Sequence, residues 1–141
     1  MARLEQLENY ESQIEEVSEK VEDSDQRLTE VQERLNSLED AIGKLGDDKQ
    51  VSESLKKNKD EANAEKEAVE QEREQLTSEL RDMQSELQEM DEQNNESDEV
   101  LSELSSVGED VSEAAAIVEQ RRQEIQGDMQ RIENMLNKLQ A

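Results

Sequence analysis

Apolar side chains recur three and four residues apart over most of this chain. From Leu7 to Leu45 only Ser24 interrupts the spacing, and a second frame of the same kind runs from about residue 52 to residue 139. Alternating threes and fours is the heptad pattern of helices that pack along one face against other helices. The pattern therefore predicts long helices, each with one apolar stripe.

Composition favours the same fold class. Proline, cysteine, histidine, tryptophan and phenylalanine are absent, and Tyr10 is the only aromatic residue. A β-sheet core draws on aromatic and β-branched residues, whereas the abundant Glu, Gln, Leu and Lys favour helix. Charged residues make up 40% of the chain, which also fits a disordered polyelectrolyte. The sustained heptads decide for an all-α fold.

The two heptad frames are out of phase across residues 46–51, where glycine and aspartate cluster. Gly46 suits a left-handed C-terminal cap, and Asp47 suits an N-terminal cap with Gln50 three residues later. We therefore expect the chain to turn back on itself here and form an antiparallel hairpin.

An antiparallel pairing can be checked by the side chains that it brings together. It places Ser24, the one polar core position of the first helix, opposite Arg73. A parallel homodimer of the first helix also offers charge matches, so charge favours the hairpin without excluding a dimer. The charged pairs expected across the hairpin are Arg34 with Glu65, Arg27 with Glu72, Lys20 with Glu79 and Glu39 with Lys56.

A second turn is predicted within DEQNNESDE, residues 91–99. Asn95 or Ser97 would cap a new helix, because short polar side chains compete with helical hydrogen bonds. Breaking the chain here gives helices over about 4–45, 51–91 and 98–139, which are similar in length. The alternative is a continuous helix with Asn94 buried in its core.

The predicted fold is an all-α, antiparallel three-helix bundle of coiled-coil-like helices, about 60 Å long at about 1.5 Å per residue. It forms a single helical domain over residues 1–141. The proposed register places Arg122 opposite Val69 and puts Gly108 in a core layer. Lys59, Lys66 and Arg73 fall at core positions, and we expect all three to extend to the rim. An extended coiled-coil dimer and a simple helical hairpin are the alternative folds.

Catalytic, cofactor and metal sites are not expected. Without histidine or cysteine, the chain lacks the usual triads, thiolate nucleophiles and zinc sites. The acidic segment DEQNNESDEVLS lacks the central glycine and closing glutamate of a calcium loop. The many carboxylates are expected to be solvated and to keep ordinary pKa values. The sequence therefore predicts a protein that is not an enzyme.

A surface for protein docking is expected on the third helix. Ile117 falls outside the core frame beside a run of alanines that would let another helix approach, and other apolar residues widen the face. The predicted docking residues are Val107, Ala114, Ile117 and Met135. The expected function is an adaptor or assembly component. The alternatives are an acidic chaperone or secretion partner for a basic or aggregation-prone client such as a toxin, and a coiled-coil rod or scaffold.

The expected partners are proteins, with a preference for basic ones because the net charge is -24. Self-association is an alternative, and nucleic acid is not expected because like charges repel. No apolar run approaches a membrane span, and no signal-peptide segment is apparent near residue 1. The expected location is the cytoplasm, with export by a signal-independent route as an alternative.

Overall fold

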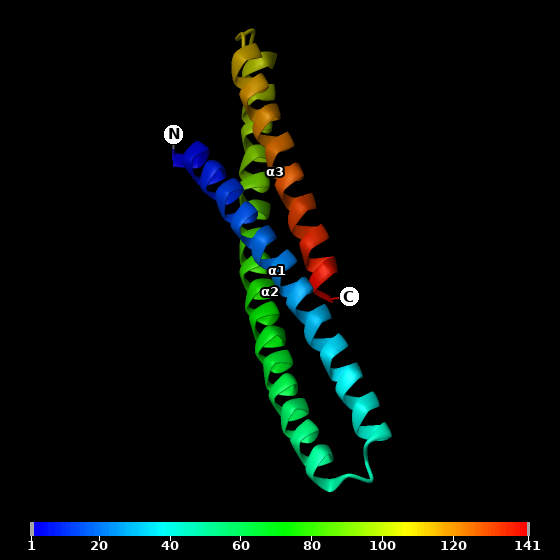
Figure 1. Ribbon diagram of the computed structural model, residues 1–141. Helices are drawn as coiled ribbons and strands as arrows, with labels where there is room; N and C mark the ends of the chain where they lie inside the picture. The colour runs from blue at the N-terminus through cyan, green and yellow to red at the C-terminus, as the bar shows by residue number, and fades with distance from the viewer. Residues whose placement is uncertain (1, 141) are drawn as a thin grey trace. The chain divides into compact units, whose positions relative to one another are not determined.

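The computed structural model describes residues 2–140, with side chains from residue 7 onward, and this part of the chain is all-helical. It contains α1 (Ala2–Lys44), α2 (Lys49–Ser106) and α3 (Ser112–Gln140) (Figure 1). The three helices pack against each other, which confirms the predicted all-α three-helix bundle. Within the described residues, no helix has the length and apolar character needed to cross a bilayer.

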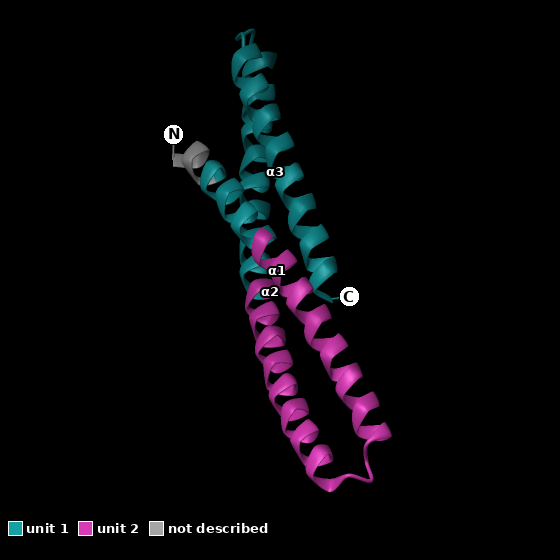
Figure 2. Cartoon of the chain, in the orientation of Figure 1, with its two compact units in different colours: residues 1–18, 78–141 teal, residues 19–77 magenta. Residues whose placement is uncertain are grey.

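The chain divides into two compact units (Figure 2). Unit 2, residues Glu19–Thr77, is a hairpin made from the end of α1 and the beginning of α2. Unit 1, residues Met1–Ser18 and Ser78–Ala141, contains parts of all three helices. The single domain expected over residues 1–141 stays a prediction.

The first turn lies where the sequence predicts it, between Lys44 and Lys49. Its N-terminal cap is Asp48 rather than Asp47: the Asp48 carboxylate accepts the backbone N–H of Val51 at 3.3 Å. Gly46 does not take the predicted left-handed conformation, since Gly108 is the only glycine among the described residues with positive φ. A Cβ on Gly46 would lie 3.3 Å from the carbonyl oxygen of Ile42, so the glycine provides space in the turn.

Unit 2 follows the predicted α1–α2 pairing. Val31, Leu35 and Ala62 form a buried cluster, with Leu28 and Leu38 packed against it. Arg27 contacts Glu72 at 2.5 Å and Arg34 contacts Glu65 at 2.6 Å, as predicted. The pair expected between Glu39 and Lys56 is wrong, because Glu39 contacts Lys59 at 3.4 Å instead. The long Lys59 side chain leaves its core position to reach this rim carboxylate.

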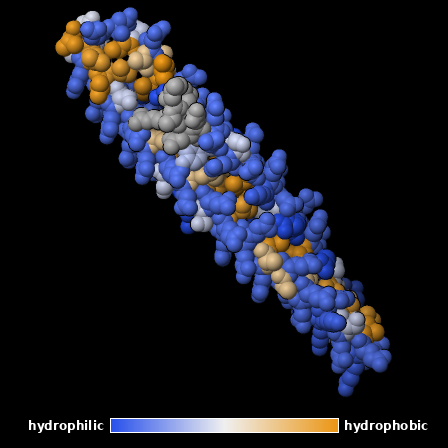
Figure 3. Space-filling view, turned by 90° about the vertical axis from the view of Figure 1, so that its left-hand side faces the viewer, coloured by the Kyte–Doolittle hydropathy of each residue, from blue (hydrophilic) through white to orange (hydrophobic). Residues whose placement is uncertain are grey.

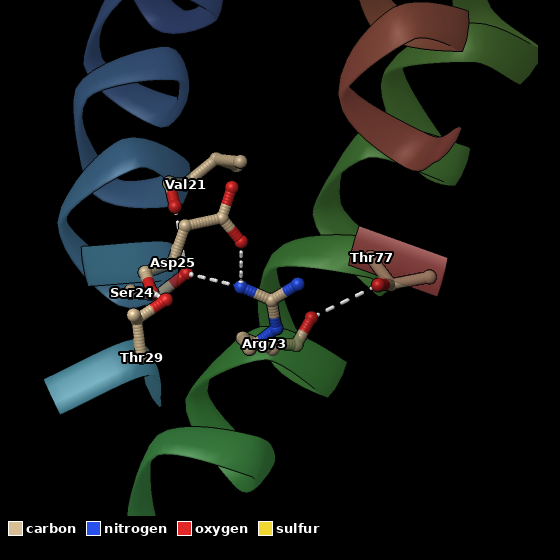
Figure 4. A network of polar contacts seen from close by, with 6 residues as sticks. All are labelled: Val21, Ser24, Asp25, Thr29, Arg73 and Thr77. Carbon is tan, nitrogen blue, oxygen red and sulfur yellow. Dashed lines mark hydrogen bonds and ion pairs between the residues drawn. The ribbon is translucent and has the colours of Figure 1, made fainter. Parts of the chain in front are cut away.

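Arg73 was predicted to extend to the rim, and this prediction is wrong. The residue is 7% exposed and donates to the hydroxyl of Ser24 at 3.1 Å, and its guanidinium also pairs with Asp25 (Figure 4). The Ser24 hydroxyl in turn donates to the carbonyl of Val21 at 2.8 Å. Small Ser24 leaves room for the guanidinium, and the nearby carboxylate offsets the cost of burying its charge.

The predicted second turn is wrong. α2 continues through residues 92–98 and ends at Ser106, and two polar residues there have partners that are compatible with a helix. Ser97 donates to the carbonyl of Gln93 at 3.1 Å, and Asn95 accepts from Arg122 at 3.1 Å. Asn94 is 2% exposed, and its Nδ2 atom has no hydrogen-bond partner. The alternative of a buried Asn94 in a continuous helix is therefore confirmed.

The chain instead turns at Val107–Val111, and Gly108 makes this possible. Gly108 has φ of +90°, and the N–H groups of Gly108 and Glu109 donate to the carbonyls of Ser105 and Leu104, both at 3.1 Å. These two bonds form a Schellman cap at the end of α2. Gly108 therefore ends a helix and does not occupy the core layer predicted for it.

Moving the turn changes the partners of α3. Arg122 contacts Asp98 and Asn95, about four heptads further along α2 than its predicted partner Val69. Gln84 donates to Glu133 at 3.2 Å in the same register. The apolar core residues of unit 1 are Leu7, Ile14, Val17, Leu80, Met83, Leu87, Met90, Val118, Ile125, Ile132, Met135 and Leu136.

Candidate protein-docking surface

Exposed apolar residues gather around the second turn, in unit 1. Six large apolar side chains among the described residues are classed as exposed, and four of them lie between residues 100 and 117. We call these four, Val100, Leu104, Val107 and Ile117, the α2–α3 tip. Figure 3 shows hydrophobic residues at the upper end of the molecule, where α2 and α3 are joined.

The four predicted docking residues differ in how exposed they are. Ile117 is 50% exposed on α3, and Val107 is 75% exposed in the turn itself. Ala114 is half-buried beside Ile117 on the first turns of α3. Met135 is 7% exposed and belongs to the core, so it cannot be part of an accessible face. Its position outside the heptad frame reflects the wider apolar stripe of a helix with two neighbours.

A shallow groove of about 480 Å³ runs beside the tip between α2 and α3. Ser97 and Ala114 are small residues in its lining, and Val100 and Ile117 are larger apolar ones. Ala114 and Ile117 were predicted from the sequence, whereas the α2 side of the groove depends on the true position of the turn. The full lining is Gln93, Glu96, Ser97, Val100 and Leu101 from α2 with Ala114, Ile117, Val118 and Arg121 from α3.

Local capping holds the two sides of the groove in place. The Asp110 carboxylate accepts both the hydroxyl of Ser112, at 2.7 Å, and its backbone N–H, at 3.1 Å. These bonds, the hydroxyl bond foremost, lower the pKa of Asp110. Further along, the Arg122–Asp98 ion pair ties α3 to α2. The Gly108 cap and the Asp110 bonds were both missed, although a glycine followed by Asp110 and Ser112 is a typical signal of a helix end and a new start.

The burial of the Asp128 carboxylate was also not predicted from the sequence. Asp128 is 5% exposed, and its Oδ2 atom has no hydrogen-bond partner. Burial raises the pKa of Asp128 to about 6; Glu11 and Glu124 raise it further, and Arg131 opposes them. The expectation that all carboxylates keep ordinary pKa values is therefore wrong at this position. Asp128 lies one heptad before Met135, so the same widened stripe buries both.

The remaining polar features give no separate site. The Arg27–Glu72 hydrogen bond raises the pKa of Arg27, which is the ordinary behaviour of an ion pair at a helix interface. Among the side chains that the structure describes, from residue 7 onward, no three or more acidic groups lie together so as to hold a metal ion. The α2–α3 tip and its groove therefore form the candidate site.

Comparisons with known proteins give no relative from which to infer a function. No protein-family model, curated protein or solved structure matches the chain.

Proposed function

We propose that this protein is a non-enzymatic helical adaptor or assembly component that docks a partner protein at its α2–α3 tip. The observation that carries the proposal is the gathering of four of the six large exposed apolar residues of the described chain at one turn. Exposed apolar side chains that gather in one region are typical of an interaction site.

The surroundings of the tip support the same function. The chain has a net charge of -24 and 30% hydrophobic residues, so few apolar side chains are available and most are used in the core. Val100 and Ile117, at 54% and 50% exposure, face the same groove from two different helices. Neither contributes to the buried core, and contact with a partner would remove both from water.

Affinity purification from the source cells tests this function. The tagged protein would be compared with a tip variant, Val100→Ser with Ile117→Ser, and with a matched control, Leu45→Ser with Val51→Ser. The control removes two other exposed apolar side chains, 47% and 38% exposed, from unit 2. Circular dichroism would first establish that all three proteins have the same helix content.

The expected result is a defined protein recovered in stoichiometric amount with the wild type and the control but lost with the tip variant. Equal recovery with all three proteins, or no stoichiometric partner with any of them, would contradict docking at the tip.

A further inference from the structure

We infer that the groove beside the α2–α3 tip binds an amphipathic helix whose polar face is basic. This inference rests on the proposed function and specifies the class of partner. It follows from the shape of the groove, from the charge around it, and from the absence of a basic residue in the last turn of α2.

The shape of the groove suits a helix. It lies between two antiparallel helices, with Ser97 and Ala114 as small lining residues and Val100 and Ile117 as larger apolar ones. Small residues allow the backbone of a third helix to approach closely, and the larger ones meet its apolar side chains. Helices commonly dock in this way, with an apolar face of i, i+3, i+4 and i+7 residues in a hydrophobic groove.

The charge around the groove favours a basic helix. Residues 91–122 contain ten acidic side chains and two basic ones, Arg121 and Arg122. Within the lining, Glu96 is opposed by Arg121 alone, and the next base along the chain, Arg122, is paired with Asp98. An approaching helix therefore meets apolar residues bordered by an excess of negative charge, which favours lysine and arginine on its polar face.

The end of α2 adds a second preference for positive charge. α1 has Lys44 and α3 has Lys138 in their last turns, whereas α2 has no basic residue there. The C-terminal turn of a helix carries partial negative charge that a cation stabilises. A basic residue of the partner, placed beside Ser106, would supply that cation.

The same charges disfavour a second copy of this chain as the occupant. Symmetric association through the tip would bring together two copies of the 91–122 segment, each with ten acidic and only two basic residues. Such repulsion opposes binding at low salt, so a basic helix fits the surface better than a self-complementary contact.

Fluorescence anisotropy with synthetic peptides tests the inference on the full chain. The probe is a labelled amphipathic peptide of about 18 residues, with leucine at helical spacing on one face and lysine on the other. A scrambled peptide of the same composition reports simple charge attraction. A third peptide, with glutamate in place of lysine, keeps the apolar face but reverses the charge.

We expect the lysine peptide to bind at least about tenfold more tightly than either control. Binding should weaken by a similar factor in Val100→Ser with Ile117→Ser, but not in Leu45→Ser with Val51→Ser. Equal binding of the scrambled peptide, equal binding of the glutamate peptide, or unchanged binding by the tip variant would each overturn the inference.

Sedimentation of the free protein tests whether a second copy of this chain occupies the groove. A dimer that is lost in the tip variant would show that a second copy fills the groove, and would also overturn the inference. Failure of the peptide experiments is distinct from failure of the proposed function, because a partner recovered from cells and lost with the tip variant would still establish docking at this surface.

Discussion

Arg73 on α2 donates a hydrogen bond of 3.1 Å to the hydroxyl of Ser24 on α1. These are the two polar residues that the antiparallel pairing of the heptad frames brings into one layer, so the contact identifies both the direction and the register of the hairpin in unit 2. Asp25, the residue that follows Ser24 on α1, pairs with the same guanidinium. A buried polar contact of this kind favours one register over others that would separate the groups.

Asp25→Ala is expected to destabilise the hairpin because it removes the carboxylate from a guanidinium that is 8% exposed. The free energy of unfolding should fall by about 1–3 kcal/mol, the cost of leaving a buried polar group poorly paired. Urea denaturation measures the change. The control is Asp23→Ala, because Asp23 is 63% exposed and its pair with Arg27 should contribute less than about 1 kcal/mol. Equal losses in both variants would contradict the role assigned to the buried contact.

Gly108→Ala and Gly127→Ala are expected to change stability in opposite directions. Gly108 has φ of +90°, where a Cβ is strained, so alanine should destabilise the turn by about 1 kcal/mol. Gly127 lies inside α3, and a Cβ added there would meet open space, so alanine should stabilise the helix by about 0.5–1 kcal/mol. Thermal denaturation of the two variants gives the comparison. A stabilising Gly108→Ala change would contradict the helix end assigned to that residue.

Asp128→Asn is expected to stabilise the protein near neutral pH. The folded-state pKa of Asp128 is raised to about 6 from an ordinary 3.8, so the folded state holds this proton more tightly than the unfolded state. The stability contributed by protonated Asp128 is therefore full below about pH 4 and is lost as the pH rises through about 6. The loss amounts to at most about 3 kcal/mol.

Urea denaturation of wild type and Asp128→Asn from pH 4 to pH 8 separates this effect from the titration of the other acids, which both proteins share. The stability advantage of the variant should grow up to about pH 6 and then level off. An advantage that does not change with pH would contradict the assignment.

Heptad reasoning predicted the first half of the fold better than the second, for a physical reason. The first turn is marked by a phase break together with Gly46 and Asp48, and the Ser24–Arg73 contact distinguishes one register from its neighbours. The second part of α2 and all of α3 share one continuous frame. A pattern that repeats every seven residues fits equally well after a shift of whole heptads. It therefore could not distinguish Val69, the predicted neighbour of Arg122, from Asp98, the observed one.

The candidate site was predicted in part for the same reason. Ile117 and Val107 are exposed as expected: Ile117 lies outside the core frame, and Val107 lies in the turn that follows α2. Burial of Met135 and Asp128 depends on which helices α3 contacts, and the groove requires Val100 to lie near Ala114. These contacts follow from the turn at Gly108. A turn near Asn95, as predicted from the sequence, would give α3 different neighbours.

Hydrogen exchange of the full chain, alone and with the lysine peptide, tests most directly the central claim that a turn at Gly108 creates a docking surface. Without peptide, the amides of residues 92–98 should exchange slowly, as in a continuous helix, and those of residues 110 and 111, which follow the hydrogen-bonded cap, rapidly. With peptide, additional protection should appear between residues 93 and 121, where the groove lies. Rapid exchange across residues 92–98, or protection by the peptide only outside the groove, would contradict the account.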